Sequence, residues 1–362
     1  MRRFLKIILQ IACLSWALTF ALQTATIHVA QAVIFSRQSE IDLGRSVAKQ
    51  VEKQYGLVND PELQARVAKI GARLAAVSDR PDMPYTFKVL NGKEINAFAA
   101  PGGPVYLFKG LADAMPSDEE LAGIIGHEIG HIVKKHVLTN IERAMVAQLL
   151  LLGIGIAGGG MPAMLPSMAM SAVMAGFSRN VEEQADHLSV IHTMRAGFNP
   201  YSTLIAMEKL KDVSPEKGGQ VGELFIDHPH TQDRINYIRD QIVNDFKVRP
   251  LATESGKFAQ VADGTWNLPP VYTTFGGYKP LLRSYLTAGQ IFRISQLKDY
   301  SADKFFMNDI NNGMAIYYDD DREPVAVVTA EDARNNGMSV SDMTALTLTR
   351  ICEWIHKSRG NE

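Results

Sequence analysis

A His-Glu-Ile-Gly-His segment contains the side chains best suited to metal chemistry in this chain. His127 and His131 are four residues apart, so on a helix they lie about 40° apart around the axis and one turn along it. Both imidazoles would project from one face and bind one metal ion. Glu128 lies about 100° round the axis from His127, outside the ligand pair but near a water molecule on the ion. This spacing is typical of zinc proteases in which the glutamate is the general base.

A pair of acidic residues on another predicted helix supplies a candidate third ligand. Glu182 and Asp186 are also four residues apart, on a second predicted helix. A carboxylate from Glu182 would complete a His₂Glu site for one Zn²⁺ and leave the fourth position open for water. Asp186 could then accept the outer N–H of His127 and fix its tautomer. Glu183 is a rival ligand by spacing, and a solvated acidic helix face is the alternative for the pair taken alone.

The His-Glu-Ile-Gly-His segment is preceded by a strong helix start. Ser117 and Glu120 have the spacing of a capping box, and acidic residues 118–120 fall in the first turn, where the helix dipole favours them. Residues 121–133 are apolar on nearly every side. The sequence therefore predicts a buried helix that carries both histidines.

Three short extended segments come before this helix. Residues 85–90, 95–99 and 105–108 are typical of strands and are separated by turn residues, which predicts a small antiparallel sheet. An extended peptide can pair with the edge of such a sheet through its backbone. An ordinary core hairpin is the alternative to a substrate-binding strand. The candidate substrate-binding residues are Asn96, Ala97, Phe98 and Ala99.

Helices dominate the rest of the chain up to a boundary near residues 245–260. Beyond it we expect strands at 314–318 and 326–329 and a helix at about 340–357. The fold class is α+β: a mainly helical zincin-type metallopeptidase domain over residues 33–250, with the small antiparallel sheet, and a C-terminal mixed α/β region of unknown role over 251–362. The helices predicted in the first domain, besides the histidine helix, cover 39–80, 179–196, 200–210 and 231–243.

The first forty residues have the pattern of a secretory signal. Arg2, Arg3 and Lys6 precede an apolar run, and Ala30-Gln31-Ala32 fits a cleavage site. We expect residues 1–32 to be a signal peptide and the protein to be exported to the periplasm or cell envelope, with an uncleaved anchor as the alternative. Cleavage would change the net charge from −2 to −5 by removing those three basic residues.

Composition excludes several classes of protein. Apolar residues make up 46% and charged residues 21%, which rules out disordered, collagen-like and disulfide-scaffold proteins. The chain has no excess of basic residues that would favour binding to nucleic acid, so we do not expect nucleic acid as a partner. Residues 144–177 are rich in Ala, Met, Leu and Gly. They predict a buried or membrane-touching hairpin, with peripheral membrane contact, or an ordinary pair of core helices.

In these motifs the chain resembles peptidase family forty-eight, the gluzincin metallopeptidases that include the HtpX, CAAX-prenyl-protease and BepA/LoiP types. The resemblance covers roughly residues 39–243, and its motifs also match in order and spacing. Neither the multiple membrane spans of the HtpX and prenyl-protease types nor a tetratricopeptide signature is found. The motifs are Asn96–Ala99 with the Gly-rich turn that follows, His127–His131, Phe177–Asp186, and His228-Pro229 followed by Arg234-Ile235.

The resemblance implies roles for particular residues. Glu182 corresponds to the third zinc ligand, and Arg234 to an arginine packed beside the site. His228 corresponds to a mobile histidine that can approach the open zinc position, where it could ligate the ion or, as imidazolium, stabilise the oxyanion. The exported branch of the family acts in envelope protein quality control.

His136 is five residues after His131, about 140° away on a continuous helix, and is expected to face elsewhere.

The sequence thus indicates an exported zinc endopeptidase. His127, His131 and Glu182 would bind zinc, Glu128 would act as general base, and protein or peptide substrates, misfolded envelope proteins among them, would be cleaved. One alternative is a chaperone or assembly factor on the same fold with a largely closed site. Another is a structural zinc site with His228 as fourth ligand. Substrate preference and oligomeric state do not follow from the sequence.

Overall fold

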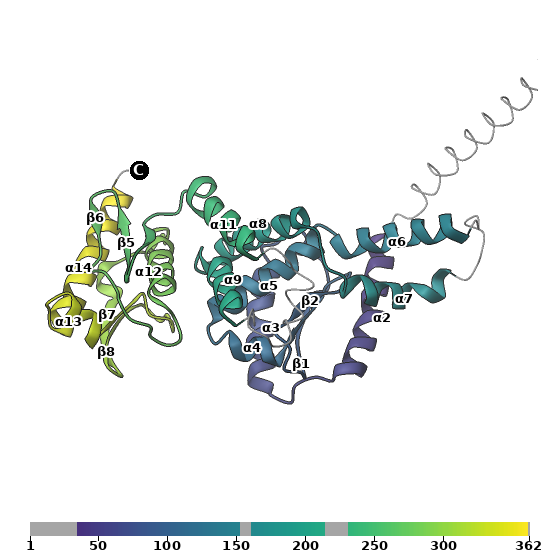
Figure 1. Ribbon diagram of the computed structural model, residues 1–362, viewed down its shortest axis with the longest axis horizontal. Coiled ribbons are helices and arrows are strands. Elements are labelled where there is room, and N and C mark those ends of the chain that lie inside the picture. The colour runs from purple at the N-terminus through teal and green to yellow at the C-terminus, as the bar shows by residue number, and fades with distance from the viewer. Residues whose placement is uncertain (1–34, 153–160, 214–230, 361–362) are drawn as a thin grey trace, which may run out of the picture.

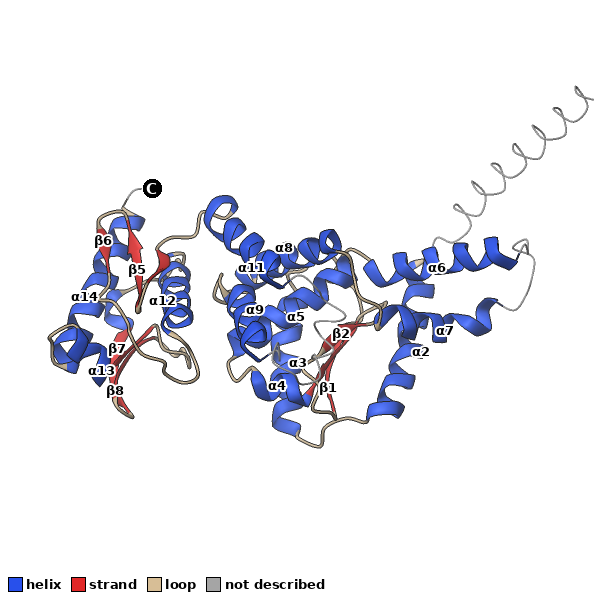
Figure 2. Ribbon diagram, viewed as in Figure 1, coloured by secondary structure: helices blue, strands red, loops and turns tan. Residues whose placement is uncertain are grey.

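The computed structural model describes residues 35–152, 161–213 and 231–360. These residues form two lobes joined after the helix α11 (Thr231–Asp240), and the second lobe lies beside α11 and α9 (Ser202–Val213) (Figure 1). Helices dominate the first lobe, and short strands are found in both (Figure 2). The predicted signal peptide, residues 1–32, and His228 lie outside the described residues.

Within the described residues, the first lobe holds three strands and most of the helices. The strands are β1 (Thr86–Leu90), β2 (Ala97–Ala99) and β3 (Pro104–Phe108). The helices are α2 (Arg37–Tyr55), α3 (Pro61–Ala75), α4 (Lys109–Ala114), α5 (Asp118–Val133), α6 (His136–Leu152), α7 (Met161–Val173), α8 (Arg179–Arg195), α9 (Ser202–Val213) and α11 (Thr231–Asp240), which continues into a π-helical turn, Gln241–Asp245.

The sheet of the first lobe has the strand order β1-β3-β2. β2 and β3 are antiparallel, as predicted, and Phe98 pairs with Tyr106. β1 instead runs parallel to β3, because the β2–β3 hairpin turns back and places β3 between the two other strands. Side chains alternate between two cores: Val105 and Leu107 join the core under α3 and α5, whereas Tyr106 and Phe108 join the core under α2 and α6.

The helix that carries the two histidines begins where the sequence predicts. Ser117 Oγ accepts from Glu120 N at 3.2 Å, and Glu120 Oε2 accepts from Ser117 N at 2.9 Å. The capping box is therefore confirmed. α5 is buried along nearly its whole length, as its apolar sequence predicts.

The helices α6 and α7 lie side by side and extend away from the rest of the lobe (Figure 1). Near the sheet they are anchored in a core, where Ile141, Met145, Ala169 and Val173 are buried with Phe98 and other aromatic residues. The residues 153–160 between them lie outside the described part of the chain. Among the described helices, none combines the length and apolarity that crossing a membrane requires.

The second lobe contains two three-stranded antiparallel sheets flanked by helices, which confirms its mixed α/β character. The strands and the helix predicted near its end are present as β8, β9 and α14. An apolar core that includes Tyr201, just before α9, and Tyr285 of α12 runs through both lobes. The elements are β4 (Leu251–Ser255), β5 (Phe258–Asp263), β6 (Trp266–Asn267), α12 (Pro280–Ser295), a 3₁₀ turn (Ala302–Lys304), β7 (Phe305–Ile310), β8 (Gly313–Tyr318), β9 (Ala326–Thr329), α13 (Ala330–Asn335) and α14 (Val340–Arg359).

Candidate metal centre

The helices α5 and α8 pack closely because α5 presents glycines on one face. A Cβ at Gly130 would lie 2.9 Å from the backbone oxygen of Ala185 on α8, and a Cβ at Gly126 would lie 2.9 Å from Ser189 Oγ. Real Cβ atoms do not come so close to a backbone atom, so position 130 favours glycine, and a Cβ at position 126 would require Ser189 Oγ to move. The close approach brings the start of α8 against the end of α5, where His127 and His131 lie.

Potential ligand atoms of three residues converge at this contact. His127 Nε2 lies 3.0 Å from His131 Nε2 and 3.4 Å from Glu182 Oε2, and His131 Nε2 lies 3.7 Å from Glu182 Oε1. All three residues are buried, and they form the cluster of metal-ligating type found among the described residues. The structure thus brings together the two histidines of α5 and the carboxylate of α8.

The spacing of these atoms fits a tetrahedral zinc ion. Zinc bonds of about 2.0–2.1 Å in tetrahedral geometry separate neighbouring ligand atoms by roughly 3.4 Å, and the three distances range from 3.0 to 3.7 Å. Two imidazoles and one carboxylate are also the donor set of catalytic zinc sites. His127, His131 and Glu182 would therefore hold the ion without a fourth protein ligand from the described residues.

Asp186 and Arg234 lie directly behind this cluster. Asp186 Oδ1 is 2.9 Å from His127 Nδ1, the contact that fixes a ligand imidazole with Nδ1 protonated and Nε2 facing the metal. The Arg234 guanidinium lies 2.8 Å from carboxylate oxygens of both Glu182 and Asp186. Arg234 is 2% exposed, so its charge compensates two buried carboxylates that would otherwise repel each other.

The charges around His127 act in opposite directions. Burial and the Arg234 charge act to lower the pKa of His127, but its hydrogen bonds to Asp186 and Glu182 outweigh them and raise that pKa to about 9. For Asp186, burial acts to raise the pKa, while Arg234 and His127 hold it below its ordinary value. The metal-free pocket is thus built to hold positive charge, as a cation site must be.

His136 lies beside the site, which corrects the expectation that it faces elsewhere. His136 Nδ1 lies 2.9 Å from His131 Nδ1. α5 ends at Val133, and Lys135 adopts a positive φ of 58°, so the chain changes direction before α6 instead of continuing as one helix. A pair of charged residues, Lys134-Lys135, closes the apolar run before His136 and is the one local signal that could have indicated this turn.

The contact between His131 and His136 fixes the tautomers of both rings. If His131 faces the metal through Nε2, its Nδ1 carries the proton and donates to His136 Nδ1. Burial lowers the pKa of His136 to about 4, so this ring is neutral and can accept. Phe177 stacks on His131 with ring centroids 4.4 Å apart, which holds the ligand ring from its other side.

The remaining candidates divide between the site and other places. Glu128 is 2% exposed on α5, and its negative charge acts to raise the pKa of Arg234. Glu183, the rival ligand, points elsewhere and pairs with Arg179 at 2.9 Å. Residues 96–99 are buried, and β2 is an edge strand that lies against α5. His228 precedes α11 and lies outside the described residues.

Comparison with known proteins assigns the family. The model of Peptidase family M48 matches residues 61–242, half of the chain, and this match includes every described residue of the candidate centre. The chain therefore belongs to Peptidase family M48, a metallopeptidase family, which confirms the resemblance read from the motifs.

Relatives from Escherichia coli (strain K12) carry related names. The chain is 30% identical to the metalloprotease YcaL over 62% of this chain and 85% of YcaL. It is 31% identical to the metalloprotease LoiP over 45% of this chain and 64% of LoiP. It is 27% identical to the beta-barrel assembly-enhancing protease over 60% of this chain, and it spans 46% of that protein's length. The second lobe falls outside the family match.

Proposed function

We propose that this metallopeptidase is a zinc endopeptidase, with His127, His131 and Glu182 as its zinc ligands. The observation that carries the proposal is the convergence of their ligand atoms from two helices: the two Nε2 atoms lie 3.0 Å apart, and they lie 3.4 and 3.7 Å from the two carboxylate oxygens of Glu182. Zinc bound there would polarise the substrate carbonyl and lower the pKa of a water molecule.

Glu128 is the proton carrier in this proposal. It follows His127 on α5, so its carboxylate lies beside the ligand pair without joining it. Glu128 would accept a proton from the attacking water and later donate it to the leaving amine. Asp186 would keep His127 in the tautomer that faces the metal, and Arg234 would hold the two carboxylates in place.

Substrate would bind in extended form along β2. Among the described residues, this strand pairs with β3 on one side only, so its outer edge would offer backbone donors and acceptors to a peptide. Residues 96–99 are themselves buried, so they would contribute backbone contacts and little side-chain selectivity. His228 would complete the site either as a ligand that closes it or as a donor to the oxyanion.

We further propose that the protein works in the cell envelope on proteins that have failed to fold or assemble. The signal-like segment at residues 1–32 supports export. One relative is named for enhancing the assembly of β-barrels, which supports a role in envelope protein quality control. Peripheral contact with a membrane through the α6–α7 hairpin belongs to the same proposal.

Three glutamate-to-glutamine variants test this function together. Glu128→Gln should keep bound zinc and lose roughly 10²–10⁴-fold in cleavage rate, because it removes only the proton carrier. Glu182→Gln should lose both zinc and cleavage. Glu183→Gln, the matched control from the next position on α8, should lose neither. The purified proteins are assayed for zinc by mass spectrometry and for casein cleavage with and without a chelator.

Two results would contradict the assignments. An active Glu128→Gln protein would exclude Glu128 as the base. A Glu183→Gln protein that loses zinc while Glu182→Gln retains it would transfer the third ligand to the neighbouring residue.

A further inference from the structure

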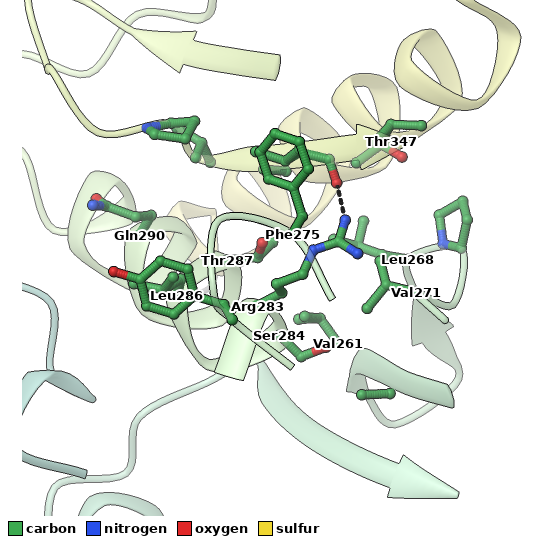
Figure 3. A pocket seen from close by; sticks show the side chains of 18 of the residues that line it. Val261, Leu268, Val271, Phe275, Arg283, Ser284, Leu286, Thr287, Gln290 and Thr347 are labelled. Carbon is green, nitrogen blue, oxygen red and sulfur yellow. Dashed lines mark hydrogen bonds between the residues drawn. The ribbon is translucent and has the colours of Figure 1, made fainter. Parts of the chain in front are cut away.

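The second lobe contains a cavity of about 250 Å³ that is lined by none of the residues of the metal centre. It lies between α12, β5, β9 and α14, and Figure 3 shows its lining. Most of the lining is apolar, so water in this cavity gains few hydrogen bonds and is readily displaced. The apolar lining residues include Val261, Leu268, Val271, Phe275, Val325 and Met343.

One buried charged side chain reaches into this lining. Arg283 is 6% exposed, and its side chain extends among the lining residues in Figure 3. Its Nη1 donates to Thr273 O at 2.7 Å, and its Nη2 donates to Val327 O at 2.8 Å. Its Nε is buried and has no hydrogen-bond partner among the described residues, so a bound acceptor would reach it when neighbouring side chains move aside. A buried donor without a partner carries a cost that a bound acceptor would remove.

The charges around the cavity select an uncharged acceptor. Asp332 is fully buried and lies 2.8 Å from Arg283 Nη2, so the guanidinium charge is already neutralised. Glu323 also lines the cavity and adds a negative charge. Burial raises the pKa of Glu323, which reflects the cost of negative charge here. A carboxylate or phosphate ligand would meet repulsion, whereas a peptide carbonyl would satisfy Nε without adding charge.

The size and border of the cavity fit a peptide segment. Sites for drug-sized ligands measure about 300–1,000 Å³, so about 250 Å³ suits one or two large side chains. β9 is an edge strand, and Val327 O points toward Arg283 instead of toward β8. Because Val327 O already accepts from Arg283 Nη2, an extended chain beside β9 would be held mainly by side chains that enter the cavity and less by pairing with the strand.

The cavity also adjoins the peptidase lobe. Tyr278 lines it, and the Lys209 ammonium of α9 lies 4.7 Å from the centre of the Tyr278 ring. Lys209 in turn pairs with Glu120 in the first turn of α5, the helix that carries both histidines. A segment bound in the second lobe is thus held next to the lobe that contains the metal centre.

We propose that this cavity binds an extended, uncharged, apolar segment of a protein substrate, with Arg283 Nε donating to one of its backbone carbonyls. The cavity would give the enzyme a preference for exposed apolar chain, the feature that distinguishes unfolded proteins from folded ones. The identity of this ligand as a substrate rests on the proposed peptidase function, whereas binding of the peptide does not.

Binding is measured on the full chain carrying Glu128→Gln, which keeps the peptide intact. The probe is a fluorescent peptide, acetylated and amidated, in which Val and Leu alternate with Ser, and its control has Gln at each Val and Leu. Thr287→Trp fills the cavity from α12 and should weaken binding of the apolar peptide roughly tenfold or more. Thr349→Trp, the same substitution at an exposed position of α14, should leave binding unchanged.

A second measurement needs no cavity variant. The same peptide carrying a benzophenone group should crosslink to segments 259–290 or 323–347, which contain the lining residues of the cavity. Crosslinks confined to other segments, equal binding by Thr287→Trp and Thr349→Trp, or displacement of the peptide by equimolar laurate would each overturn the proposal. A wild-type protein that holds zinc but cleaves nothing would refute the peptidase function and leave these binding results standing.

Discussion

His131 and His127 are oriented by different kinds of partner. His127 faces the carboxylate of Asp186 at 2.9 Å, whereas His131 faces the neutral ring of His136 at 2.9 Å. A carboxylate makes a ligand imidazole more basic than a neutral acceptor does. The Glu182 and Asp186 carboxylates and the Arg234 guanidinium sum to one negative charge, and the buried Glu128 carboxylate adds a second, so a divalent cation is favoured at the centre.

Replacement of His136 tests its role in positioning His131. His136→Leu removes the acceptor and should weaken zinc binding roughly 10–100-fold, the usual cost of losing a residue that orients a ligand. His136→Asn places an amide oxygen near the former Nδ1 and should recover much of this loss. Zinc affinity is measured by competition with a chromophoric chelator. If both variants lose the same affinity, or neither loses any, His136 only fills space.

At the scale of elements, the contact between α5 and α8 sets the distance between the histidines and Glu182. Gly130→Ala gains about 1 kcal/mol in helix propensity, but its Cβ would lie 2.9 Å from Ala185 O, and overpacking costs about 1–3 kcal/mol. We expect α8 to move away and zinc affinity to fall about tenfold.

The control for Gly130→Ala is Gly360→Ala at the end of α14, where the nearest atom lies 3.4 Å from the added Cβ. It should keep the zinc affinity of the wild type. Zinc titration and urea unfolding of both variants separate a shift of α8 from general destabilisation. Unchanged zinc affinity in Gly130→Ala would show that the helix contact tolerates the methyl group.

The interaction of α13 with α12 makes stability depend on pH. Burial acts to raise the pKa of Asp332, but Arg283 and the Tyr272 N–H hold it below the ordinary 3.8. Its charged form therefore stabilises the fold above that pH, and this contribution is lost as pH falls through the lowered pKa. Asp332→Asn should lower the free energy of unfolding by about 3 kcal/mol at pH 7. The difference in this free energy between the wild type and the variant should become smaller only below about pH 4.

Urea unfolding of the wild type and of Asp332→Asn between pH 7 and pH 3 measures this difference. A gap that closes already near pH 6 would assign the stabilisation to another group. The asparagine side chain retains one oxygen that can accept from the backbone N–H groups. The loss therefore reports mainly on the ion pair between Asp332 and Arg283, whose charged atoms lie 2.8 Å apart.

Helices and helix starts that depend on local periodicity could be predicted from the sequence. Contacts between side chains that meet because the backbone changes direction could not. The capping box at Ser117 and the spacing of Glu182 and Asp186 depend on residues within about one turn of each other. The turn at Lys135 depends on a positive φ in a residue that rarely adopts it, so a continuous helix places His136 wrongly. The cavity could not be predicted from the sequence either, because residues up to 88 positions apart, from Ala259 to Thr347, line it.

At the scale of the whole molecule, the two lobes share one apolar core. The rings of Tyr201 and Tyr285 stack across the contact at 5.0 Å, and Asn199 Nδ2 donates to Leu286 O at 2.9 Å. Both tyrosines are nearly fully buried. Because this contact is apolar and hydrogen-bonded, the position of the second lobe beside the peptidase lobe is fixed by packing and not by the linker alone.

The lobes should therefore unfold together in the wild type and separately when this contact is opened. A Cβ at Gly289 of α12 would lie 1.7 Å from Asn199 Oδ1, so Gly289→Leu should push α12 away. In a chain that begins at residue 33, Trp266 and Trp354 are the tryptophans, and both report on the second lobe. Far-UV circular dichroism reports mainly on the helices of the first.

In urea, the fluorescence and dichroism transitions of the wild type should coincide. In Gly289→Leu the fluorescence transition should move roughly 1 M lower, since the second lobe loses packing worth about 1–3 kcal/mol. Gly360→Leu, at an exposed glycine, should keep the two transitions together. Separate transitions in the wild type would mean that the two lobes unfold independently. A peptide bound in the cavity of the second lobe would then not be held at a fixed position relative to the metal centre.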